Sequence, residues 1–144
     1  MSAVDAMAAR LTTAEPGERV QTAIARMLED EVASVAVIEE GRLVGIFTER
    51  DVLRLAGGGS AFGELRLRDV MTTELVTVAP DDDLVAAARL MQERRIRHLP
   101  VIQDGKLLGI LGIREVLRTL VERLWSDRDA DARDTARDLL TRRV

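Results

Sequence analysis

The sequence contains no cysteine, and this absence excludes several kinds of site. Without a thiol the chain has no disulfide, no thiolate metal ligand and no cysteine nucleophile. Aromatic residues are also scarce, because only Phe47, Phe62 and Trp125 are present. Any hydrophobic core must therefore be built from Val, Leu, Ile, Met and Ala.

Long apolar runs and a basic excess are missing as well. No stretch approaches the roughly 18 apolar residues of a membrane span, and the N-terminus lacks the basic and apolar segments of a signal peptide. We therefore expect a cytoplasmic protein without a membrane partner. The 21 basic and 25 acidic residues are interspersed and give a net charge of −4, which argues against a nucleic-acid partner.

The chain does contain an internal repeat, offset by about 64 residues. Residues 5–54 align without a gap on residues 69–118, with about 18 identities in about 50 positions. Each repeat is too short to form a robust core alone, so we expect the two to share one core as a pseudo-twofold pair. The sequence predicts four segments: repeat one over 1–56, a Gly-rich linker over 57–63, repeat two over 64–124 and a C-terminal helical tail over 125–144.

Both repeats show the same order of elements. An extended segment (11–14 or 75–79) precedes a proline, and an amphipathic helix follows. The predicted apolar helix faces are Val20, Ile24, Met27 and Leu28 in repeat one, and Leu84, Ala87, Ala88 and Met91 in repeat two.

Two short strands and a closing helix complete each repeat. The strands are predicted over 34–38 and 43–47, then 99–102 and 107–111, with a glycine in each connecting turn. The fold class is therefore mixed α/β (α+β), built from two β-α-β-β-α repeats and a C-terminal helical tail. The first two strands of a repeat, joined by a helix, are expected to be parallel, and the second and third antiparallel.

Three features have a simple structural interpretation beside a functional one. Asp81, Asp82 and Asp83 stand where a helix begins, which favours capping over metal binding. The run 57–60, Gly-Gly-Gly-Ser, lacks the lysine of a phosphate-binding loop and indicates a flexible joint. The tail carries a thin apolar stripe that could dock on a second subunit.

Several motifs together resemble the CBS-domain family, whose tandem pairs are called Bateman modules. The resemblance rests on the repeated Asp-x-Met motif at 5–7 and 69–71, the strand Arg-His-Leu-Pro-Val-Ile at 97–102, the glycine-containing hairpins and Gly-Ile-Phe-Thr-Glu-Arg-Asp at 45–51. It covers about 5–120, and the order, spacing and duplication of the motifs carry it. The family implies packing through the sheets and two clefts that bind AMP, ADP, ATP, S-adenosylmethionine or NAD. It also implies a homodimer, and a sensor role that acts on a partner protein.

The chemistry of an adenine nucleotide can be compared with these residues. Asp51, in the first turn of the closing helix, could accept both ribose hydroxyls. Thr48 could donate its hydroxyl to a phosphate, beside free backbone amides at the helix start. Thr48-x-x-Asp51 is also the pattern of a plain helix cap.

Repeat two departs from this pattern, because Gly112 replaces the threonine and Glu115 the aspartate. We therefore expect repeat one to hold the better nucleotide site. The family places phosphate-binding groups before the second strand and before the ribose acid. Those positions hold Arg97 and His98 in repeat two, and Arg50 and Arg114 in the two repeats. A composite site that combines residues of both repeats is one arrangement, and solvated surface charge is the other.

The resemblance also implies contacts with adenine from the first strand, at Thr12 and Val76, and from Ile46, although a core role explains such apolar residues equally well. His98 is the only histidine and has no cysteine or metal cluster to act with, so we expect no catalysis. The candidate ligand-binding residues are Thr12, Ile46, Thr48, Arg50, Asp51, Val76, Arg97, His98, Arg114 and Glu115.

The function expected from these residues is that of a non-catalytic regulatory sensor with an adenine nucleotide as ligand, no required cofactor and no metal. The alternative is a structural dimerisation or adaptor protein with empty pockets, because repeat two has already lost part of the pattern.

Overall fold

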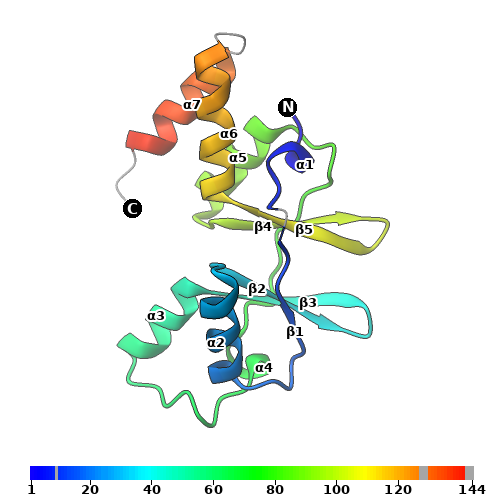
Figure 1. Ribbon diagram of the computed structural model, residues 1–144, viewed down its shortest axis with the longest axis vertical. Helices are drawn as coiled ribbons and strands as arrows, with labels where there is room; N and C mark the ends of the chain where they lie inside the picture. Colours follow the sequence, from blue (N-terminus) through cyan, green and yellow to red (C-terminus); the bar gives the residue numbers. More distant parts are fainter. Residues whose placement is uncertain (9, 127–129, 142–144) are drawn as a thin grey trace. The chain divides into compact units, whose positions relative to one another are not determined.

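The protein forms two compact units in the computed structural model, which describes residues 1–8, 10–126 and 130–141 (Figure 1). Unit 2 consists of Arg10–Leu75 and Gly105–Leu107. Unit 1 consists of the N-terminal segment from Met1, Val76–Asp104 and the segment from Leu108 onward. Each unit has its own buried apolar cluster, so the prediction of one shared core is wrong.

Unit 2 contains the elements predicted for repeat one, together with a short helix from further along the chain. The strands are β1 (Thr13–Ala14), β2 (Ser34–Glu39) and β3 (Arg42–Thr48), and the helices are α2 (Val20–Asp30), α3 (Glu49–Gly57) and α4 (Leu67–Val70). The sheet order is β1-β2-β3. The strands β1 and β2, which α2 connects, are parallel, whereas β2 and β3 are antiparallel, as predicted.

Unit 1 repeats this plan with a reduced sheet. It contains α1 (Ala3–Ala6), α5 (Leu84–Arg94), β4 (His98–Gln103), β5 (Lys106–Gly112), α6 (Ile113–Ser126) and α7 (Ala130–Thr141). The strand predicted over 75–79 does not form, because the segment pairs only through a parallel bridge between Val78 and Val101. This bridge has the same register as the pair Ala14 and Val37 in unit 2, so the two segments are placed equivalently.

The two hairpin turns confirm the role predicted for their glycines. Gly41 has a φ of 77° and Gly105 a φ of 76°, and the residues before them, Glu40 and Asp104, are also left-handed. Two consecutive positive φ values match the twist of the flanking strands, and glycine adopts them without a steric penalty.

The helix between the first two strands buries its predicted face in unit 1 but only partly in unit 2. All four predicted residues of α5 are buried. In α2, however, Leu28 is 75% exposed and Ile24 is only half-buried, so their assignment to the core is wrong. The difference follows from α7, which contacts both α5 and α6 and covers their outer side (Figure 1).

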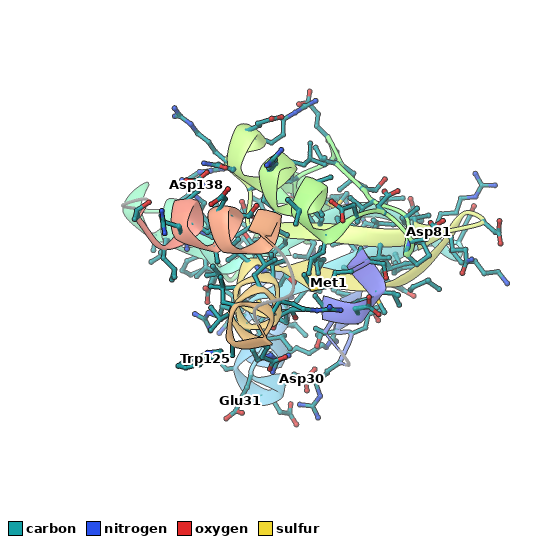
Figure 2. The ribbon with its side chains drawn as sticks, turned by 90° about the horizontal axis from the view of Figure 1, so that it is seen from above. Met1, Asp30, Glu31, Asp81, Trp125 and Asp138 are labelled. Atoms are coloured by element: carbon teal, nitrogen blue, oxygen red, sulfur yellow. The ribbon has the colours of Figure 1, made fainter. Side chains whose placement is uncertain are left out.

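The C-terminal tail therefore packs on its own chain. Ala136 of α7 is fully buried in the core of unit 1, and Leu139 packs against the same cluster. Trp125 near the end of α6 and Leu140 of α7 remain 85% and 64% exposed (Figure 2). Positions 127–129 and 142–144 of the predicted tail, and the side chain of Ala132, lie outside the described residues.

A buried ion pair ties the start of α2 to the first strand of unit 2. Arg26 Nη2 lies 2.7 Å from Glu18 Oε1, and Arg26 Nη1 donates to the carbonyl of Thr13 at 2.7 Å. The Glu15 amide donates to Glu18 Oε2. The hydrogen bond from Arg26 is the main cause that holds the pKa of Glu18 below its ordinary value of 4.5.

We expect Glu18→Gln to weaken the dependence of stability on acid pH. A lowered carboxyl pKa contributes stability that is present above the unfolded value of 4.5 and lost as the pH falls through the folded value. The melting temperature of the wild type should therefore fall more steeply below about pH 4.5 than that of Glu18→Gln. The control is Glu64→Gln, at an exposed position of the same unit, which should follow the wild-type curve. Parallel curves for wild type and Glu18→Gln would contradict the prediction.

Candidate functional site

The start of α3 holds the predicted pair Thr48 and Asp51 in a reciprocal cap. The Thr48 amide donates to Asp51 Oδ2 at 2.9 Å, and the Thr48 hydroxyl lies 3.2 Å from the same oxygen. The Asp51 amide in turn lies 3.4 Å from Thr48 Oγ1. The helix-cap interpretation is therefore realised, since each side chain satisfies a backbone donor of the other residue.

The cap leaves one carboxylate oxygen of Asp51 differently placed. Asp51 is only 8% exposed, which is unusual for an acid. Its second oxygen, Oδ1, lies 3.7 Å from the exposed Arg54 guanidinium, one turn further along α3. A pair of this length with an exposed arginine is weak, so Oδ1 keeps the capacity to accept hydrogen bonds from a ligand.

The other candidates of unit 2 come from β1, β3 and α3. Arg50 is exposed and takes part in an interaction of its own. Ile46 is buried, and its backbone pairs with Thr72 through two hydrogen bonds of 3.0 Å. Thr12 is also buried, and its hydroxyl donates to Asp30 Oδ2 at 2.8 Å. The side chains of Ile46 and Thr12 thus have structural roles already, so contact with adenine would fall to the neighbouring backbone.

The candidates of unit 1 gather where β4 begins and α6 starts. Arg97 is exposed, and its carbonyl accepts a hydrogen bond from the amide of Ile113 at 2.8 Å. His98 is half-buried, with Cδ2 3.7 Å from the position that a Cβ on Gly112 would take. The backbone pair repeats the 3.0 Å bond from the Glu49 amide to the Ala33 carbonyl in unit 2.

Glu115 occupies a different position from its counterpart Asp51. The carboxylate folds back over Gly112, so that Oε2 fills the space of the missing side chain. Arg114 is exposed and has an interaction of its own, and Val76 is half-buried against the core of unit 1. The composite arrangement that joins residues of both repeats stays a prediction.

The acidic run before α5 acts as a set of caps, as predicted. Asp83 Oδ2 accepts from the amide of Ala86 at 3.0 Å, and Asp82 Oδ2 accepts from that of Ala79 at 2.8 Å. Within the described residues, no group of three or more His, Cys, Asp or Glu side chains could hold a metal ion. Across the same residues, no helix is long and apolar enough to cross a membrane.

Two Gly–Met contacts near the sites escaped the sequence analysis. A Cβ on Gly45 would lie 2.5 Å from Met71 Sδ, and a Cβ on Gly109 would lie 2.6 Å from Met7 Sδ. Each glycine therefore allows a methionine to pack directly on a strand. The repetition of both residue types signals that they matter, but it does not show that each methionine packs on the other repeat.

The family comparison agrees with this geometry. The CBS domain model matches residues 3–58 and 67–122. The chain is 33% identical over 114 residues to the CBS domain-containing protein YhcV of Bacillus subtilis, covering 78% of this chain and 81% of that protein. It is 36% identical over 110 residues to the mitochondrial CBS domain-containing protein CBSX3 of Arabidopsis thaliana, where it covers 72% of this chain but only 53% of the relative.

Among solved structures, CBSX2 in complex with AMP superposes with a TM-score of 0.72 at 28% identity, covering 84% of this chain and 97% of that one. The repeated elements, the helix-start acids and both family matches lead to one conclusion: the chain is a tandem pair of CBS domains and belongs to the CBS-domain family.

Proposed function

We propose that this protein is a non-catalytic regulatory module that binds an adenosine-containing ligand, with AMP, ADP or ATP as the preferred class. The observation that carries the proposal is the buried carboxylate of Asp51, held in place by Thr48 at the start of α3. A carboxylate that its own helix already orients loses little freedom on binding, and it can accept hydrogen bonds from ribose hydroxyls.

The phosphates would lie near the same helix start. A helix N-terminus favours anions through its backbone amides, and Arg50 in the first turn of α3 adds a positive charge. The AMP complex of CBSX2, a relative at 28% identity, supports an adenine nucleotide as the ligand.

The proposed action is on another protein. Candidate nucleophile–base pairs and metal clusters do not occur among the described residues, so we propose no reaction for this chain. A change in ligand occupancy would instead alter the surface that a partner recognises, and a homodimer remains the expected assembly.

The alternative is a structural adaptor with empty sites, and one observation favours it. Thr48 and Asp51 satisfy each other in the cap, and Glu115 fills the space beside Gly112 without any ligand. Neither arrangement therefore requires a bound molecule.

Thermal-shift and calorimetric titrations separate the two functions. At a concentration about 100 times its Kd, a ligand at one site adds about 2.7 kcal/mol to the free energy of unfolding, which raises the melting temperature by several degrees. We expect this shift with AMP or ATP and none with ribose 5-phosphate, which lacks the adenine. If AMP, ATP, NADH and S-adenosylmethionine all leave the melting temperature unchanged, the adaptor function is the correct one.

A further inference from the structure

The two helix starts of the pair have equivalent backbones but different side chains. In unit 2 the amide of Glu49 bonds to the carbonyl of Ala33, and in unit 1 the amide of Ile113 bonds to that of Arg97. The chain therefore enters α3 and α6 in the same way. The differences between the two sites must come from side chains, above all from Thr48 and Asp51 against Gly112 and Glu115.

Gly112 is a glycine because of space and not because of backbone conformation. Its φ is not in the left-handed region, where only Gly41, Gly59 and Gly105 are found among the described glycines. A side chain here would meet Glu115 Oε2 directly and would come within 3.7 Å of His98 Cδ2. The glycine and the longer acid are thus coupled, because the carboxylate occupies the volume that the glycine leaves empty.

This coupling changes the chemistry offered at the helix start. Thr48 presents a hydroxyl, which can donate a hydrogen bond to a phosphate oxygen. At the equivalent place in unit 1 stands the carboxylate of Glu115, which can only accept hydrogen bonds when ionised and repels a phosphate. Glu115 is also drawn away from the position from which Asp51 could reach a ribose.

We propose that Gly112 and Glu115 act as one unit that determines specificity, so that the site of repeat two rejects a 5′-phosphate and takes an adenosine ligand whose 5′ substituent is uncharged or cationic. The inference rests on the proposed function, because it assumes that both helix starts face adenosine ligands. It adds that one chain holds two sites of different specificity, set by a two-residue exchange.

The test rebuilds the pair of repeat one in repeat two with the double variant Gly112→Thr/Glu115→Asp. Calorimetry with AMP should find one site per chain in the wild type and two in the double variant. Titration with S-adenosylmethionine should show the opposite trend, with binding at least tenfold weaker in the double variant. Asp51→Ala should remove the AMP site of the wild type but leave the new site of the double variant.

The single variants test the coupling without any ligand. Gly112→Thr alone should lower the melting temperature, because the new side chain meets the Glu115 carboxylate. Adding Glu115→Asp should restore most of that loss. An equal effect of Gly112→Thr with and without Glu115→Asp would overturn the coupling.

The outcomes for ligand binding separate this inference from the proposed function. If AMP binds the wild type at a site that needs Asp51, and the double variant gains no second site, the specificity inference is wrong and the proposed function stands. If neither protein binds any adenosine ligand, both are wrong.

Discussion

Asp51→Ala is expected to weaken AMP binding by about 30- to 150-fold. This corresponds to the loss of a hydrogen bond to a charged acceptor, which contributes about 2–3 kcal/mol. Because Asp51 also caps α3, the same change should lower the free energy of unfolding by about 1 kcal/mol. Isothermal titration calorimetry measures the first effect, and thermal unfolding the second.

Two further variants separate the role of Asp51 in binding from its role in the cap. Asp51→Asn keeps an oxygen that can accept the Thr48 amide, so its stability should stay close to that of the wild type, while AMP binding falls at least tenfold because the charge is gone. Glu115→Ala should leave AMP binding unchanged. Equal losses of affinity from Asp51→Ala and Glu115→Ala would refute the assignment of the AMP site to repeat one.

Ala136→Glu is expected to be the most destabilising of these substitutions. Ala136 is fully buried where α7 packs on the core of unit 1, and burying an unpaired charge at such a position costs about 3 kcal/mol or more. We expect the melting temperature to fall by about 10 °C, or α7 to detach and expose the apolar side of α5 and α6. Thermal unfolding measures the first result, and binding of a hydrophobic dye measures the second.

The matched control is Leu140→Glu, one turn further along α7, where the leucine is 64% exposed. The introduced residue is the same and the helix is the same, so only burial differs. This variant should stay within about 0.5 kcal/mol of the wild type. Similar behaviour of the two variants would show that α7 does not pack on unit 1 in solution.

The exchange of short segments between the repeats could not be predicted from sequence. The aspartates of the two Asp-x-Met motifs cap α1 and α4, where Asp5 accepts from Ser2 and Asp69 from Arg66. Helix α1 then packs with α5 and α6, whereas α4 packs with β3. Local patterns predict a cap, but they carry no information about which of two similar repeats a segment will contact.

The site was predictable in its residue types and only partly in its geometry. The spacing of Thr48 and Asp51 was sufficient to place both at a helix start, because a capping pattern depends on neighbouring residues alone. The return of Glu115 over Gly112 depended on which rotamer the longer side chain adopts when a volume is left empty, and this is a property of packing.

The sequence by itself determined the order of strands and helices in both repeats, the positive φ at Gly41 and Gly105, and the residues at each helix start. These features follow from periodicity, turn chemistry and spacing, all of which act over a few residues. Only the tertiary structure decided that the units have separate cores, that α7 covers the helices of unit 1 and leaves Leu28 exposed on α2, and that each methionine packs on the other repeat's glycine. Nearly identical repeats offer nearly identical surfaces, so the choice between them is made by long-range packing.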